Sequence, residues 1–336
     1  MKWIVKRQAG YYFEIASGRF SKYLGRELPE KKVLAKKVFE YLEEFSGLVV
    51  GMTDQKVKDY FKYTGIEEIE KQRFYFKALN HDLNRGELMH FHTAFKVLFS
   101  LNSSRAEGSR MKEVDLMKVK KPKTFEQKEA ANAVKALEWA FSKEFTWSTA
   151  SIRKIHYLLF HDIEPELAGK YKEHDNVAGD SLYGRVVSTT PHQKVKEAMM
   201  KLVEELKRGR AKVYPPILAL ESHLKFEIIH PFHDGNGRVG RILLNRILLE
   251  HFFMPVIFFE GNHEAYCNSI GLAREGRKDK YIKLFVKQMK NTRKKIEEAR
   301  KVGGFYSERK NLMIQWNYSQ KRVNLLFSNL KGKYKS

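Results

Sequence analysis

Twelve consecutive residues carry the side chains of this sequence that are best suited to chemistry. They run from His230 to Arg241 and read HPFHDGNGRVGR. Pro231 disfavours the helical conformation at the residue before it, so a helix is expected to end at His230. Imidazole can exchange a proton near neutral pH, which makes His230 the candidate general base.

The two glycines that follow predict an anion-binding loop. Gly235 and Gly237 leave successive backbone N–H groups accessible, at the point where an apolar helical pattern begins. A helix N-terminus favours anions, so phosphate is the expected ligand. Asp234 would repel phosphate unless a divalent cation lay between them. Mg²⁺ is commonly held by one or two carboxylates together with substrate phosphates.

Two arginines extend this phosphate site along the helix. Arg238, Arg241 and Asn245 are spaced i, i+3 and i+7, so they share one helix face. Guanidinium groups can bind a polyphosphate through paired hydrogen bonds. Each feature alone has an ordinary structural interpretation, such as a helix cap, a turn or a solvated face. Their occurrence together favours a nucleotide phosphate site.

The segment from His230 to Arg241 resembles the signature H-x-F-x-(D/E)-G-N-G-R-x-x-R of the Fic family, and every specified position matches. The resemblance extends over roughly residues 103–289. It implies a mainly α fold, namely a Fic-type helical bundle with a short β-hairpin flap. A small N-terminal β patch would precede this bundle.

The resemblance also implies an activity. The protein would transfer AMP from ATP to a Ser, Thr or Tyr hydroxyl of a target protein or of itself, with Mg²⁺ as cofactor. His230 would act as the base, Asp234 would hold Mg²⁺, and Phe232 would be a buried anchor. The phosphates would be bound by Gly235, Asn236, Gly237, Arg238 and Arg241.

Further roles follow from the same resemblance. Residues 182–189 match the flap that aligns the target by strand addition, with Val186 and Val187 as its candidate contacts. The nucleoside pocket would include Tyr266, Cys267 and Arg274. At the last two positions some members have a second tyrosine and an asparagine, so the base preference stays open.

Ser103, Glu107 and Gly108 resemble the inhibitory motif (S/T)-x-x-x-E-(G/N). In members that carry this motif, the glutamate pairs with the second motif arginine, here Arg241, and displaces the γ-phosphate. An autoinhibited enzyme is therefore expected. The alternative is the reverse reaction, in which Glu107 positions water to remove AMP from a modified protein.

The remaining elements can be read from periodicity and turn residues. Strands are expected within residues 3–24, and a helix that begins near residue 33 should stop at Gly47. Thr124 and Gln127 form a capping box, and Thr190 is expected to cap a helix that starts with Pro191. Four regions result: a basic β-hairpin segment (1–27), an N-terminal helical region (28–102), the Fic core with the inhibitory motif (103–290) and a basic helical tail (291–336).

Composition limits the class of protein. The 336 residues include 43% hydrophobic residues, which is enough for a large core, and one cysteine, which excludes an internal disulfide. No signal peptide or membrane-length apolar run is evident, so a cytoplasmic protein without a membrane partner is expected. The sequence leaves a homo-oligomer open.

The net charge of +23 attracts anions of every kind. It suits an acidic target protein, and it also supports a second hypothesis, a nucleic-acid-binding regulator that acts through basic termini. Lys6, Arg7 and Lys22 lie near Tyr11 and Tyr12 in the first segment. No recognisable nucleic-acid module accompanies these residues.

Overall fold

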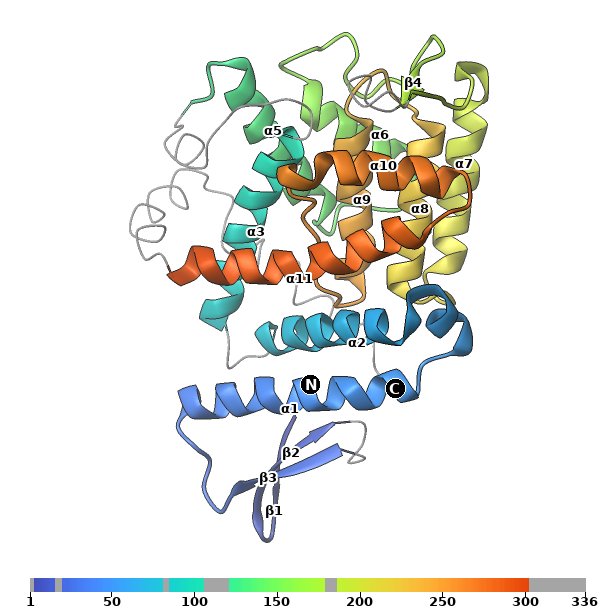
Figure 1. Ribbon diagram of the computed structural model, residues 1–336. Coiled ribbons are helices and arrows are strands. Elements are labelled where there is room, and N and C mark those ends of the chain that lie inside the picture. Colours follow the sequence, from blue (N-terminus) through green and yellow to red (C-terminus); the bar gives the residue numbers. More distant parts are fainter. Residues whose placement is uncertain (1–2, 16–19, 81–84, 106–120, 179–185, 302–336) are drawn as a thin grey trace. The chain divides into compact units, whose positions relative to one another are not determined.

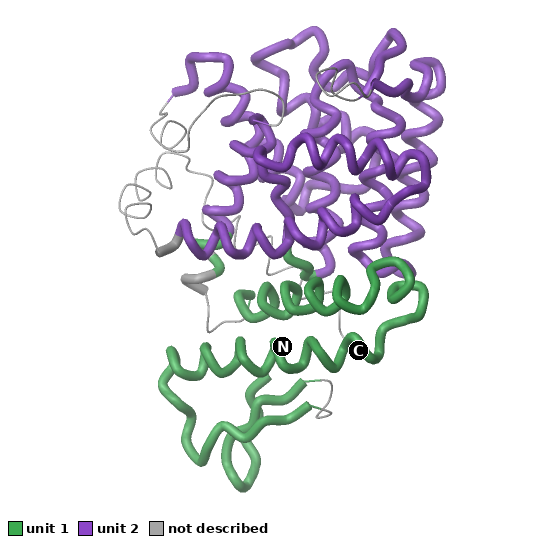
Figure 2. Tube along the Cα trace, in the orientation of Figure 1, with its two compact units in different colours: residues 1–91, 252–254 green, residues 92–251, 255–336 purple. Residues whose placement is uncertain are grey.

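The computed structural model describes residues 3–15, 20–80, 85–105, 121–178 and 186–301 (Figure 1). It divides into two compact units (Figure 2). Unit 1 comprises Met1–Phe91 and Phe252–Met254, and unit 2 comprises His92–His251 and Pro255–Ser336. The finer division into four regions stays a prediction.

A three-stranded antiparallel sheet opens unit 1, as the sequence predicts. Its order is β1 (Ile4–Arg7), β2 (Gly10–Ile15) and β3 (Phe20–Gly25). Gly10 has φ of +134°, and a Cβ there would lie 2.4 Å from the carbonyl oxygen of Gly25. Only glycine fits the start of β2 for this reason.

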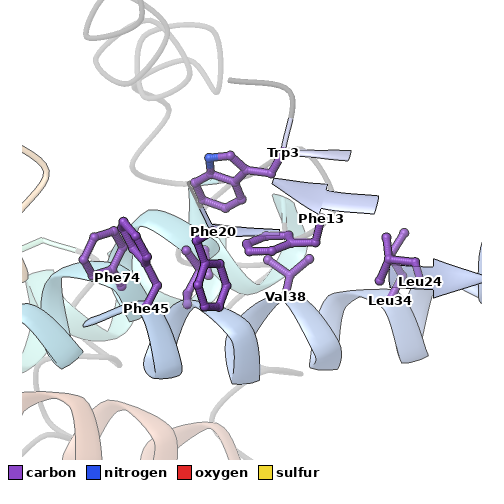
Figure 3. Packing of buried hydrophobic residues seen from close by; sticks show 10 residues of the cluster. Trp3, Phe13, Phe20, Leu24, Leu34, Val38, Phe45 and Phe74 are labelled. Atoms are coloured by element: carbon purple, nitrogen blue, oxygen red, sulfur yellow. The ribbon is translucent and has the colours of Figure 1, made fainter. Parts of the chain in front are cut away.

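The core of unit 1 forms where one face of this sheet meets α1 (Lys31–Gly51) and α2 (Gln55–Leu79). Figure 3 shows this apolar cluster, which is dominated by aromatic rings. The ring of Phe45 lies 5.3 Å from that of Phe20 and 5.2 Å from that of Phe74, so it joins sheet to helices.

Helices make up most of unit 2. They are α3 (Arg85–Arg105, whose first turns belong to unit 1), α5 (Phe125–Ala140), α6 (Thr149–Phe160), α7 (His192–Gly209), α8 (Pro215–Ile229), α9 (Asn236–Glu250), η3 (Glu260–Asn262), α10 (His263–Arg274) and α11 (Asp279–Lys301). Strands β4 (Val177–Ala178) and β5 (Val187–Ser188) pair antiparallel. The fold is thus the mainly helical one expected. None of the described helices is long and apolar enough to span a membrane.

The helix ends test the capping predictions. The capping box of Thr124 and Gln127 is present at the start of α5. The prediction that Gly47 ends the first helix is wrong, because α1 continues for another turn and buries Val50 completely. The start of α7 lies one position later than expected, since Pro191 is the N-cap and Thr190 is outside the helix.

Close contact between α8 and α9 organises the centre of unit 2, where the two helices lie side by side (Figure 1). Gly240 of α9 permits this approach. A Cβ at that position would lie 2.8 Å from Oε1 of Glu227 and 3.2 Å from Cδ2 of His223. Both neighbours are buried side chains of α8, so neither can move aside freely.

We therefore predict that Gly240→Ala destabilises the protein. Overpacking should lower the free energy of unfolding by about 1–3 kcal/mol, measured by denaturant titration. Gly271→Ala in α10 is the matched control, because a Cβ there meets nothing within 4 Å. The control should leave stability unchanged or raise it by about 0.4–1 kcal/mol. Equal effects of the two substitutions would contradict this account.

Candidate functional site

The loop between α8 and α9 begins at His230. This residue caps α8 with φ of 49° and ψ of 60°, in the left-handed region. Its N–H still donates to the carbonyl of Phe226 at 2.9 Å. A non-glycine residue there costs about 1–2 kcal/mol. Pro231, which disfavours the helical alternative, helps to hold His230 in this conformation.

Gly235 provides the sharp turn into α9. Its φ is +73°, and a Cβ would lie 2.4 Å from Cε2 of Phe160, so both conformation and space require glycine. No side chain caps α9 from this position. The N–H groups in the first turn of a helix have no partners within the helix. The start of α9 therefore suits an anion, as the glycine pattern predicts.

The side chain of Asn236 closes the loop. Its amide nitrogen donates to the carbonyl of Phe232 at 2.9 Å, and its oxygen accepts from the Phe232 N–H at 2.9 Å. Phe232 itself is fully buried, as expected for an anchor. Direct contact between Asn236 and a phosphate stays a prediction, whereas its role in shaping the loop is evident from these two bonds.

Arg238 is buried among two carboxylates and an aromatic ring. Its guanidinium donates to Oε1 of Glu129 at 2.5 Å and to Oδ2 of Asp234 at 3.1 Å. The guanidinium carbon lies 4.7 Å from the centroid of Phe160. The buried charge of Arg238 is thus compensated, and the orientation of its guanidinium is fixed. Sequence reasoning missed Glu129, a carboxylate on the buried, alanine-rich face of α5.

Arg241 meets the first residue of the predicted inhibitory motif. Its Nε and Nη2 donate to the Oγ of Ser103 at 3.1 and 3.0 Å, and Nη2 also donates to the Ser103 carbonyl at 3.1 Å. Both residues are 3% exposed. The contact joins the end of α3 to α9. Glu107 and Gly108 lie outside the described residues.

Residues 186–189 are the described part of the predicted flap, and they contain β5. Val187 of β5 pairs with Ala178 of β4, and Val186 precedes β5 with 48% of its surface exposed. The exposed valine next to a two-residue ladder is compatible with strand addition. The role of Val186 and Val187 in target alignment stays a prediction.

A polar cluster ties these strands to the loop, and it was not anticipated from sequence. Lys172 is buried and donates through Nζ to Oδ1 of Asn176 at 2.6 Å and to Oγ1 of Thr189 at 2.7 Å. Burial lowers the pKa of Lys172. Asn176 in turn donates to the carbonyl of Phe232 at 2.9 Å. Flap and loop therefore share one hydrogen-bonded network.

The three residues predicted for the nucleoside pocket occupy different environments. Tyr266 is buried, with its hydroxyl 3.0 Å from Nε2 of His223, and this burial raises the pKa of its phenol. Cys267 Sγ lies 3.5 Å from Nε2 of His263. Arg274 lies against β5, with Nη2 3.4 Å from the Ser188 carbonyl. The pocket itself stays a prediction.

A second histidine, His156 of α6, packs against the loop. Its ring stacks between Phe160 and Phe232, at centroid distances of 4.6 and 4.0 Å. The Gly169 N–H donates to Nδ1 at 2.9 Å, so Nε2 carries the proton and donates to the Asp234 carbonyl at 3.1 Å. Burial lowers the pKa of His156 to about 4, which keeps the ring neutral.

The structure thus gathers His230, the start of α9, Asp234 and two buried arginines around a single loop. Known proteins are similar to this chain in sequence and in fold. A model of the Fic/DOC family matches residues 146–248. A Fido domain-containing protein of Dictyostelium discoideum is 31% identical over 124 residues, which cover 35% of this chain and 82% of that protein. The chain belongs to the Fic/DOC family.

Two other similarities are informative. A probable protein adenylyltransferase of Aquifex aeolicus is 56% identical over 54 residues, which span 16% of each chain. A Fic domain-containing signaling protein of Bacteroides thetaiotaomicron shares the fold, with a TM-score of 0.59 and 20% identity. That match covers 69% of this chain and 97% of the other. The chain thus matches only a small part of the Aquifex relative's length.

We predict that His156→Phe weakens the loop although it preserves an aromatic ring in the stack. The substitution leaves the Gly169 N–H and the Asp234 carbonyl without their partner, so the free energy of unfolding should fall by about 2 kcal/mol. His161→Phe, at the partly exposed end of the same helix, is the control and should change stability by about 0.5 kcal/mol or less. Hydrogen exchange at the Gly169 N–H should be faster in His156→Phe and unchanged in His161→Phe, which would locate the loss of stability at this hydrogen bond.

Proposed function

We propose that this protein is an adenylyltransferase that transfers AMP from ATP to a hydroxyl of a target protein or of itself. The observation that carries the proposal is the loop from His230 to Arg241, where a base precedes an uncapped helix start and two buried arginines. Relatives named as protein adenylyltransferases match this chain over short segments.

In the proposed reaction the target oxygen attacks the α-phosphorus of ATP. The bond between this phosphorus and the bridging oxygen breaks, pyrophosphate leaves, and the hydroxyl proton passes to His230. The N–H groups at the start of α9 face the developing charge, while Arg238 and Arg241 bind the outer phosphates. The two guanidiniums are already oriented by packing, so little reorganisation is needed during the reaction.

Mg²⁺ fits the proposed site through Asp234. This carboxylate is 51% exposed, and among the described residues no group of three or more potential ligands forms a metal cage. A single accessible carboxylate is the donor set expected for Mg²⁺ that is held jointly with substrate phosphates. When bound, the ion would neutralise phosphate charge.

We further propose that the enzyme is autoinhibited. Ser103 already engages two nitrogens of Arg241, the arginine expected to bind the outer phosphates. This contact supports the inhibitory motif of Ser103, Glu107 and Gly108, because it brings the first residue of the motif to the phosphate site. Glu107 is proposed to pair with Arg241 and to displace the γ-phosphate.

The alternative of a nucleic-acid-binding regulator gains little support from unit 1. Arg7 lies over the ring of Tyr12 but also pairs with Glu14, and Lys22 pairs with Glu44 at 2.6 Å. Part of the predicted basic patch is therefore neutralised by its own carboxylates. Residues 291–301 of the predicted basic tail belong to α11, and residues 302–336 lie outside the described residues. An acidic target protein and a cytoplasmic location remain proposals from charge and composition.

The activity can be tested by intact-mass measurement after incubation with Mg²⁺ and each nucleoside triphosphate in turn. We expect a mass increment of one AMP on the protein with ATP, and none with His230→Ala or after chelation of Mg²⁺. His233→Ala is the matched control, an exposed histidine in the same loop, and should retain the increment. An increment that persists in His230→Ala would contradict the proposed base. Absence of an increment in both the wild type and Glu107→Gly, with and without added target proteins, would contradict the activity.

Autoinhibition predicts that Glu107→Gly increases AMP incorporation. Loss of one charge-assisted contact of about 1.5–3 kcal/mol should raise the rate roughly tenfold or more. Ser103→Ala should give a smaller gain, because the Ser103 carbonyl still accepts from Arg241. Ser104→Ala, at an equally buried neighbour, should give none. If the protein instead removes AMP from modified targets with the help of Glu107, Glu107→Gly will abolish that removal.

A further inference from the structure

A buried carboxylate lies one helical turn before the proposed base. Oε2 of Glu227 is 3.7 Å from Nδ1 of His230, and the two side chains are 9% and 17% exposed. His230 lies three positions after Glu227, so the end of α8 places the two side chains on the same face. The general-base mechanism described above gives Glu227 no role.

Groups from α9 and α10 face Glu227. From α10, the guanidinium of Arg274 interacts electrostatically with Glu227. From α9, Gly240 leaves room for the carboxylate, since a Cβ there would lie 2.8 Å from Oε1. Tyr266 of α10 is held as a neutral phenol, because burial and the charge of Glu227 both raise its pKa.

His223 also faces this carboxylate, with Nε2 3.6 Å from Oε1 of Glu227. It is fully buried, and its ring nitrogens lie 2.7 Å from the hydroxyl of Tyr281 and 3.0 Å from that of Tyr266. Burial and the nearby charge of Arg241 lower the pKa of His223 to about 3, so it stays neutral. Of the two histidines beside Glu227, His230 is the one proposed as the base.

We propose that Glu227 is the positioning residue of His230. Its carboxylate holds the proton of the imidazole on Nδ1, which leaves the Nε2 lone pair for the target hydroxyl, and it stabilises the imidazolium formed when that proton is taken. A separation of 3.7 Å is longer than a hydrogen bond, but catalytic contacts often tighten only when substrate is bound. The proposal deepens the proposed function and rests on it for the identity of the substrate.

The counter-ion of Glu227 connects the base to the flap. Nη2 of Arg274 lies 3.4 Å from the carbonyl of Ser188 in β5 and 3.4 Å from that of Ile228 in α8. The strand proposed to align the target is therefore in contact with the guanidinium that balances Glu227. This geometry joins target alignment and orientation of the base in one cluster of charged groups.

Histidine NMR tests the proposal without relying on activity. The His230 signals are identified by their absence in His230→Ala, and their pH titration is compared in wild type, Glu227→Gln, Glu227→Asp and Glu250→Gln. Removal of an opposite charge at this distance should lower the pKa of His230 by about one unit or more in Glu227→Gln and reduce the fraction protonated on Nδ1. Glu227→Asp should restore part of the shift.

Glu250→Gln is the matched control. Glu250 is also buried and accepts from Arg246 at 2.8 Å, but it lies at the far end of α9 from the loop. It should leave the His230 titration unchanged. An unchanged pKa and tautomer of His230 in both Glu227→Gln and Glu227→Asp would overturn the proposal, and a shift of equal size in Glu250→Gln would do the same.

Kinetics then separates this inference from the proposed function. With ATP, kcat of AMP transfer in Glu227→Gln should fall at least about tenfold, with KM for ATP unchanged and the acidic limb of the pH profile moved to lower pH. A rise in KM for ATP with kcat unchanged would contradict a positioning role. If the NMR shift is seen while the wild type transfers no AMP to any protein, the proposed activity fails and the pairing of Glu227 with His230 stands.

Discussion

Two hydrogen bonds between the Asn236 side chain and the Phe232 backbone close the loop on which the site depends. They hold the end of α8 and the start of α9 in a single conformation, so that His230 and Gly235 can both adopt left-handed backbone angles. The closed loop also presents Phe232 to His156, which stacks on it at 4.0 Å. Opening of the loop would break both hydrogen bonds and the stacking of Phe232 on His156.

Charge at the site is fixed before any substrate arrives. The two arginines are almost fully buried, yet both have partners, because Arg238 pairs with the carboxylate of Glu129 from α5 and Arg241 donates hydrogen bonds to Ser103 from α3. A buried guanidinium without such partners would carry a large desolvation cost. In the proposed function, a nucleotide that binds these arginines would meet the same groups that hold them now. Nucleotide binding and the proposed inhibition would therefore involve the same buried guanidiniums.

Polar contacts also connect the loop to strands β4 and β5. Lys172 and Asn176 bind the short β4–β5 ladder to the carbonyl of Phe232, and Arg274 contacts both β5 and the end of α8. Strand addition at this ladder would thus act on backbone that is already connected to the base. Because Lys172 is buried and Asn176 is partly buried, small displacements would cost hydrogen bonds that water does not readily replace.

The sequence by itself determined the helical class, the strands of unit 1, the end of α8, the start of α9 and the family, because Pro231, the glycines and the helical periodicity act over a few residues. It also pointed to His230, Arg238 and Arg241 as candidates. Only the tertiary structure brought Glu129 to Arg238, Ser103 to Arg241 and His156 to Asp234, across 109, 138 and 78 positions of the chain. No local pattern encodes such pairings, since they arise from packing of separate helices. For the same reason, the end of α1 was decided by burial of Val50 and not by the local preference of Gly47.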